Sequence, residues 1–271
     1  AYFKPATSLN PETAKLYGMN RLTVMRQIYY DLDSQSSIDM GLFINGLPIA
    51  TIELKNQFTG QTFKNAIKQY KKDRVPTLKT PLLGFKKRAL VHFAVDTDEA
   101  YMATRLSGDK TYFLPFNTGN HGGRGNPDDH SYETGYKTGY LWEKIWERDS
   151  WLDIVHRFIH VQVEEEKDPD TGKTKTKETL IFPRYHQLDA VRKLVSKTQL
   201  EGVGKSNLIQ HSAGSGKTNT ISWTAHQLAS LHDDQNEPVF NSVIVISDRR
   251  NLDKQLQDCI YSIEHRRGVV E

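Results

Sequence analysis

The sequence contains one cysteine, no hydrophobic run of membrane-spanning length and no charged-then-apolar leader at its start. A lone cysteine, Cys259, excludes a disulfide within the chain and is typical of proteins from a reducing compartment. A helix that crosses a membrane would need about 20 consecutive apolar residues, and secretion would need a leader. We therefore predict a cytoplasmic protein with no membrane partner.

An excess of one charge is also missing, because 36 lysine and arginine residues nearly balance 33 aspartate and glutamate residues. The net charge of +3 is too small to indicate nucleic-acid binding by itself. Two local basic clusters, at residues 64–74 and 86–88, are dense enough to neutralise phosphates, but a solvated helix face explains them equally well. The first cluster comprises Lys64, Lys68, Lys71, Lys72 and Arg74.

A glycine-rich segment at residues 211–218, His-Ser-Ala-Gly-Ser-Gly-Lys-Thr, has the spacing of a phosphate-binding loop. It lies between a short apolar run at 207–210 and a helix-like segment at 219–231, in the strand–loop–helix order that such a loop requires. Glycines let successive N–H groups point at an anion, and the start of the helix adds a favourable dipole. His211 replaces the usual first glycine, and a glycine-rich turn with an unrelated lysine is the alternative. The predicted ligands of ATP are Gly214, Ser215, Gly216, Lys217 and Thr218, with Lys217 on the β- and γ-phosphates and Thr218 on Mg²⁺.

Three charged residues belong to a predicted β-hairpin: Asp39 on its first strand, and Glu53 and Lys55 at the end of its second. Two converging carboxylates can hold Mg²⁺, and Lys55 would orient water or stabilise charge on an attacked phosphate. Asn45-Gly46 favours a tight turn, yet a regular two-residue loop would pair Asp39 with Ile52 and turn Glu53 away. We therefore predict a three-residue loop or a one-residue bulge. The alternative is a surface ion pair between Glu53 and Lys55.

The alternation of helical and extended segments predicts an α/β protein of two domains. The first is expected to span residues 1–160 and the second 181–271, with a charged hairpin or linker at 161–180 between them. The apolar run at 242–247 is typical of a strand buried on both faces in a parallel sheet. Further strands are predicted at 21–31, 38–44, 48–55, 89–96 and 100–106, and helices at 62–73, 140–160 and 185–198.

The hairpin with its two acids and its lysine resembles the PD-(D/E)xK nuclease superfamily. Residues 41–56, Gly-Leu-Phe-Ile-Asn-Gly-Leu-Pro-Ile-Ala-Thr-Ile-Glu-Leu-Lys-Asn, more narrowly resemble the R subunit of type I restriction enzymes. Residues 182–191, 211–218 and 243–250 resemble the adenine-reading segment, motif I and motif Ia of superfamily 2 helicases. The order of nuclease first and motor second is that of the R subunit.

This resemblance implies roles for individual residues. Asp39 and Glu53 would be metal ligands and Lys55 the catalytic lysine. Gln187 would read the edge of adenine, since an amide can pair with two ring positions together; an exposed helix position is the alternative. The implied fold is a mixed-sheet nuclease domain flanked by helices, followed by the first part of a RecA-like parallel α/β motor domain.

The sequence also departs from the family pattern. Related nucleases often carry a Gln-x-x-x-Tyr element after the lysine; here Tyr70 is present, but Ala66 occupies the glutamine position, and Gln69 is out of register. The later motor motifs are missing from the sequence. We therefore expect a piece of a larger enzyme, with a nuclease domain truncated at its start and a partial motor domain that hydrolyses ATP poorly alone.

The function implied by the resemblance is that of a type I site-specific deoxyribonuclease subunit. It would cut DNA with Mg²⁺ and, in the full protein, couple this to ATP-driven translocation of double-stranded DNA. The implied partners are double-stranded DNA and the modification (methyltransferase) and specificity subunits of the same system. Two alternatives are another nuclease–helicase of DNA repair, and a catalytically silent DNA-binding scaffold.

Overall fold

The computed structural model describes residues 1–7, 9–31, 33–128, 131–167, 172, 174–248 and 250–263. The chain divides into two compact units: residues 1–3 with 15–153, and residues 4–14 with 154–271. A short helix, α1 (Pro11–Gly18), spans the boundary between these two sets of residues. Within the described residues, no helix has both the length and the apolar character needed to cross a membrane.

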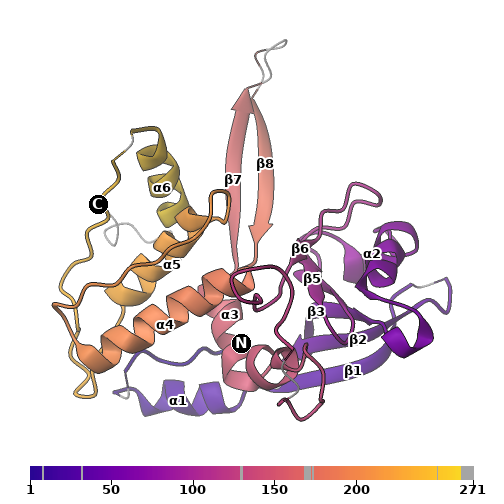
Figure 1. Ribbon diagram of the computed structural model, residues 1–271, viewed down its shortest axis with the longest axis horizontal. Coiled ribbons are helices and arrows are strands. Elements are labelled where there is room, and N and C mark those ends of the chain that lie inside the picture. Colours follow the sequence, from indigo (N-terminus) through magenta and orange to yellow (C-terminus); the bar gives the residue numbers. More distant parts are fainter. Residues whose placement is uncertain are drawn as a thin grey trace. The chain divides into compact units, whose positions relative to one another are not determined.

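A mixed sheet of six strands forms the centre of the first unit (Figure 1). The strands lie side by side in the order in which they occur in the chain, and all neighbours are antiparallel except β3 and β4. The five strands predicted in this half of the sequence are confirmed, with shifts of a few residues at their ends. The strands are β1 (Leu22–Tyr29), β2 (Ser37–Ile44), β3 (Leu47–Leu54), β4 (Val91–Val95), β5 (Ala100–Ala103) and β6 (Leu114–Pro115).

The parallel pair β3–β4 requires a crossover, and the helix α2 (Phe63–Lys72) supplies it. Two 3-10 turns, η1 (Gln57–Thr59) and η2 (Pro81–Leu83), flank this helix in the connection. The helix contacts both β3 and β4. The side chains of α2 that point inward pack against one face of the sheet and form a buried cluster with it. Alternate residues of each strand contribute to this cluster, because they point to the same face. The members of this cluster are Tyr30, Ile38, Ala66, Tyr70, Leu83, Ala94 and Leu106.

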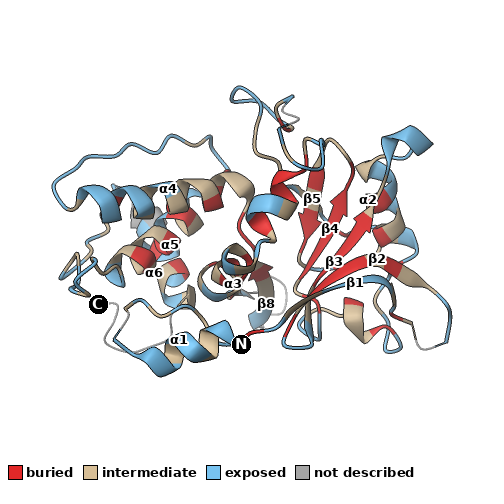
Figure 2. Cartoon of the chain, turned by 90° about the horizontal axis from the view of Figure 1, so that it is seen from below, coloured by how far each residue is buried: buried red, intermediate tan, exposed pale blue. Residues whose placement is uncertain are grey.

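Aromatic side chains cover the opposite face of the sheet. The ring of Phe93 lies 5.6 Å from that of Phe116 and 5.4 Å from that of Trp146, both in edge-on contact. The sheet is therefore covered on both faces, and its central strands are buried (Figure 2). The segment that carries Trp146 was predicted to be helical; it forms a π-helical turn, η3 (Leu141–Ile145), followed by the helix α3 (Arg148–Arg157).

Among its described residues, the second unit contains a two-stranded antiparallel hairpin and the helices α4, α5 and α6, together with the start of α1 and the end of α3. The hairpin corresponds to the segment predicted as a charged hairpin or linker, residues 161–180. Helix α5 contacts both α4 and α6, and fully buried Trp223 on α5 packs its ring 5.4 Å from Phe158. The elements are β7 (His160–Lys167), β8 (Thr174–Ile181), α4 (Tyr185–Glu201), α5 (Lys217–Ala229) and α6 (Arg250–Ile263).

Two strand predictions in this unit are wrong. Residues 207–210 and 242–247 have no strand assignment, and Leu208, Ile244 and Ile246 are more than four-fifths exposed. An apolar run indicates that a segment is suited to a sheet interior, but the strand forms only where neighbours supply the ladder of hydrogen bonds. Within the described residues neither segment has such a neighbour.

Candidate active site and nucleotide-binding loop

The β2–β3 hairpin carries the irregularity that the sequence analysis predicts. Asn45 and Gly46 both have positive φ, 51° and 82°, and form a two-residue turn that pairs Ile44 with Leu47. The register then shifts by one residue, because Phe43 pairs with Pro48 whereas Leu42 pairs with Ala50. Such an extra residue in one strand is a β-bulge. The predicted bulge is thus confirmed, and the three-residue loop offered as its alternative is wrong.

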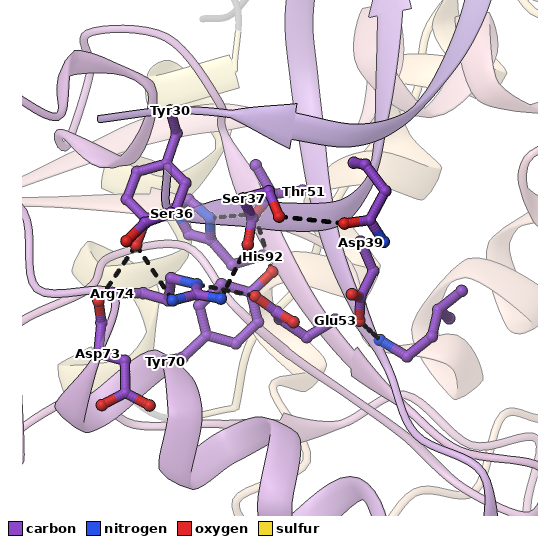
Figure 3. Close-up of polar contacts among 12 residues, drawn as sticks. Tyr30, Ser36, Ser37, Asp39, Thr51, Glu53, Tyr70, Asp73, Arg74 and His92 are labelled. Carbon is purple, nitrogen blue, oxygen red and sulfur yellow. Dashed lines mark hydrogen bonds and ion pairs between the residues drawn. The ribbon is translucent and has the colours of Figure 1, made fainter. Parts of the chain in front are cut away.

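The bulge brings the three charged residues together, and Figure 3 labels the two acids, Asp39 and Glu53. Beyond it Met40 pairs with Ile52, so the next pair in this register is Asp39 and Glu53. The amine of Lys55 lies 3.9 Å from a carboxylate oxygen of Asp39 and 3.9 Å from one of Glu53. The backbone N–H of Leu54 donates to the same Asp39 oxygen at 2.8 Å, which holds this carboxylate against the end of β3.

Burial distinguishes this group from a surface ion pair. The side chain of Glu53 is fully buried and that of Lys55 is 13% exposed, whereas Asp39 is 30% exposed. Charges removed from water cost several kcal/mol each unless they are compensated. The alternative of a solvated Glu53–Lys55 pair is therefore wrong, and the three groups form a partly enclosed polar site whose open side is at Asp39.

The surroundings of Glu53 disfavour its ionised form. Burial, and after it the charge of Asp39, raises the pKa of this carboxyl group from 4.5 to about 7. Oxygen Oε1 accepts a hydrogen bond from Arg74, but buried Oε2 accepts none within the described part of the chain. A buried oxygen without a donor, beside a second carboxylate, is what a divalent cation would compensate.

The donor set fits a hard cation such as Mg²⁺, with Asp39 and Glu53 as its protein ligands. No group of three or more histidine, cysteine, aspartate or glutamate residues arranged to hold a metal occurs among the described residues. The protein would thus supply two carboxylates. This agrees with Mg²⁺ chemistry, because the ion usually keeps several water molecules and binds through one or two carboxylates plus substrate phosphates.

Arg74 is a member of the site that sequence reasoning missed. Its Nε donates to Glu53 at 2.9 Å, one terminal nitrogen donates to the Tyr30 hydroxyl at 3.1 Å, and the other donates to the carbonyl of Ser37 at 2.8 Å. The residue is 9% exposed. The sequence analysis grouped it with the surface lysines of a basic cluster, and no local pattern marks it as different. The only available signal was indirect: a buried glutamate requires a cationic partner.

Tyr70 has a structural rather than a catalytic setting. Its hydroxyl shares a 2.9 Å hydrogen bond with Thr51, which in turn contacts Nδ1 of His92 at 2.7 Å. Burial lowers the pKa of His92 to about 3 and raises that of Tyr70 well above its usual value. Both side chains are therefore neutral near pH 7. Ala66, at the position of the missing glutamine, is buried in the core beside Tyr70.

The predicted phosphate loop lies at the start of α5. Gly214 and Gly216 adopt positive φ, 71° and 81°, and Gly216 caps the helix that begins at Lys217. The Lys217 amine donates to the carbonyls of Ser212 at 2.9 Å and His211 at 3.3 Å. The Lys217 amine is thus bound by carbonyl groups of its own loop. A phosphate that entered here would exchange these two carbonyl contacts for stronger charged ones.

Gln187 on α4 is held against this loop. Its amide nitrogen donates to the carbonyls of Gly216 at 2.8 Å and Ser215 at 3.2 Å, while its oxygen accepts from the N–H of Arg184 at 2.9 Å. The residue is 3% exposed, so the alternative of an exposed helix position is wrong. Adenine reading stays a prediction, and it would require the amide to exchange these bonds for bonds to the base.

Fold and site together describe an α/β protein in which a carboxylate–lysine hairpin precedes a phosphate-binding loop. Residues 9–111 match the family model described as type I restriction enzyme R protein N terminus. Residues 186–269 match the family model of SWI2/SNF2 ATPases. The first match includes the hairpin site, and the second includes Gln187 and the phosphate loop.

The chain is also 29% identical, over 234 residues, to a protein of Methanocaldococcus jannaschii that bears the provisional name type I restriction enzyme MjaVIIIP endonuclease subunit. The match covers 84% of this chain and 20% of the relative, so the chain spans about a fifth of that protein's length. The predicted relationship is confirmed. Residues 9–111 thus resemble the N-terminal part of type I restriction enzyme R subunits, and residues 186–269 resemble an SNF2-like ATPase.

Proposed function

We propose that the first unit cuts double-stranded DNA by Mg²⁺-dependent hydrolysis of a phosphodiester. The observation that carries this proposal is the position of the Lys55 amine, 3.9 Å from both carboxylates, next to a buried Glu53 oxygen that accepts no hydrogen bond from the described residues. Asp39 and Glu53 would hold the ion, which when bound would polarise the phosphoryl oxygens.

In this proposal the side chains have distinct tasks. Lys55 orients the attacking water and offsets the negative charge that develops on the phosphate. Arg74 holds Glu53 through Oε1 and leaves Oε2 facing the site. In the hydrolysis, the water oxygen joins phosphorus, one P–O bond of the backbone breaks, and the departing oxygen gains a proton.

We further propose that the second unit is the beginning of a RecA-like motor that binds ATP and Mg²⁺ through Gly214, Ser215, Gly216, Lys217 and Thr218. The SWI2/SNF2 match, which includes this loop, supports the proposal. In the full protein, ATP hydrolysis would drive translocation of double-stranded DNA, in assembly with modification and specificity subunits.

Two substitutions in the full-length protein, assayed with its partner subunits, test these roles. Lys55→Ala should abolish cleavage and preserve ATP-dependent translocation, because it changes only the hairpin site. Lys217→Ala should abolish translocation. If the Lys55→Ala complex still cuts DNA, the nuclease assignment is wrong and a DNA-binding scaffold remains. If the wild-type protein cuts without partner subunits, a repair-type nuclease–helicase is the better assignment.

A further inference from the structure

The helix α2 presents two chemically different faces. Ala66 and Tyr70 face the core and are fully buried. Asn65, Lys68 and Lys72 are exposed and are spaced three and four residues apart, so they form one stripe along the helix. The side chains of this stripe therefore lie on one side of the helix, which the sequence cluster alone could not establish.

This stripe borders an open cavity of about 350 Å³ next to the candidate active site. Lys55 lines the cavity, and so do Lys68 and Lys72. Asp73 is the acidic residue in the lining, so three amines against one carboxylate leave a net positive charge. The remaining lining residues are Gln61, Asn65 and Gln69.

The donors in this lining match a phosphodiester backbone. Amines and side-chain amides donate to phosphate oxygens, and contacts of this kind hold a duplex without reading its sequence. None of the lining residues is aromatic, so the cavity offers no surface on which a base could stack. From Lys68 to Lys72 the helix rises by about 6 Å, which allows the two amines to follow a strand.

We propose that this cavity binds the backbone of double-stranded DNA beside the phosphate that is cut, with Lys68 and Lys72 as its main contacts. The inference rests on the proposed nuclease function, because Lys55 belongs both to the cavity and to the carboxylate site. Lys64 lies on the same helix but does not line the cavity, and Arg74 is turned inward to Glu53. The basic cluster of the sequence thus separates into members with different tasks.

Lys72 must give up an existing contact before it can bind a DNA phosphate. Lys72 donates to Asp109 at 2.8 Å, and both side chains are more than half exposed. Exposed pairs of this kind contribute little. A DNA phosphate would therefore replace Asp109 as the partner of Lys72 without an appreciable cost.

The test compares two lysines of one helix. Lys68→Ala and Lys64→Ala are each introduced into the full-length Lys55→Ala protein, which leaves the DNA intact, and binding of a 30-base-pair duplex is followed by fluorescence anisotropy without ATP. Lys68→Ala should reduce the slope of log K against log salt concentration by about one, and the Lys68→Ala/Lys72→Ala pair by about two. Lys64→Ala should leave the slope unchanged.

The matched design makes the outcome decisive. The motor segment contributes equally to DNA binding in all variants, and unchanged thermal unfolding midpoints would show that the exposed substitutions preserve the fold. Equal slopes for Lys64→Ala and Lys68→Ala overturn the cavity as a DNA site. Failure of the nuclease function is recognised separately, since DNA cleavage by the Lys55→Ala complex would then persist whatever the slopes are.

Discussion

Arg74 and Glu53 lie 21 positions apart in the chain, yet Nε of Arg74 donates to Oε1 of Glu53 at 2.9 Å inside the protein. The arginine follows the C-terminus of α2, and the glutamate is the last residue but one of β3. This pair ties the crossover helix to the strand that carries the candidate active site. It also compensates one of the two carboxylate oxygens, so that the other is left for a cation.

We predict that Arg74→Ala destabilises the protein more at pH 8 than at pH 5. Removing one partner of a buried ion pair costs about 3 kcal/mol when the other remains charged. At pH 5 Glu53 is protonated in the variant, and the loss should be smaller by at least about 1 kcal/mol. Urea unfolding at the two pH values measures this difference. Arg88→Ala removes an exposed arginine and should change stability by less than about 0.5 kcal/mol; equal losses for Arg74→Ala at both pH values would contradict the account.

We predict that Mg²⁺ stabilises the nucleotide-free protein at pH 8 and much less at pH 5. The pKa of Glu53 is raised from 4.5 to about 7, first by burial and then by Asp39. Because the folded value is the higher one, the contribution of this group to stability is fully present below pH 4.5 and is lost as the pH rises through 7. A cation bound to the ionised carboxylates restores it. At a hundredfold excess over its Kd, Mg²⁺ would add about 2.7 kcal/mol.

Thermal unfolding in Mg²⁺ and in EDTA, at both pH values, measures this effect. Glu53→Gln is the control, because it removes the charge that the cation would balance, and the difference between Mg²⁺ and EDTA should disappear. ATP is left out, so that the phosphate loop contributes no second metal site. A Mg²⁺ effect of the same size in the Glu53→Gln variant would place the cation elsewhere.

We predict that Tyr70→Phe lowers stability by about 1 kcal/mol and changes the DNA cleavage rate by less than about twofold. The hydroxyl of Tyr70 makes its hydrogen bond to Thr51, and the loss of one such bond costs about this much. Unfolding measurements and the cleavage assay of the full complex are compared on the same variant. A loss of cleavage at unchanged stability would show instead that the tyrosine assists the reaction.

The hairpin shows how far the sequence could predict the site. Asn45-Gly46 indicates the turn, and strand alternation indicates which residues face each other. A regular hairpin would separate Asp39 from Glu53, so their convergence requires a bulge, and the structure has one before Ala50. This step succeeded because the register of a hairpin follows from local rules.

Other features depend on contacts between distant segments. Arg74 belongs to a run of charges that is also typical of a solvated helix end, and only the packing of α2 against β3 turns it toward Glu53. The runs at 207–210 and 242–247 have the composition of buried strands, but hydrogen-bonding partners decide whether a strand forms. The composition of a segment indicates only whether that segment is suited to burial. The residue or strand that it pairs with belongs to another part of the sequence.

The phosphate loop permits the sharpest stability prediction. A Cβ atom at Gly216 would lie 2.4 Å from the amide nitrogen of Gln187, and the φ of Gly216 is +81°. Gly204 has a φ of +83°, but a Cβ there would meet nothing within 4 Å. Gly204→Ala should therefore cost only the backbone strain, about 1–2 kcal/mol. Gly216→Ala should cost more, because it also breaks the contact between Gln187 and the loop.

A double-mutant cycle separates the cost of the backbone strain at Gly216 from the cost of the clash with Gln187. In the Gln187→Ala background, Gly216→Ala should cost no more than Gly204→Ala, since the clashing amide is gone. Urea unfolding of the four proteins in the cycle, together with the Gly204→Ala control, provides the free energies. Additive losses would mean that Gln187 does not restrain the loop, whereas a coupling of about 1 kcal/mol or more would confirm that this glutamine holds the phosphate loop in its present form.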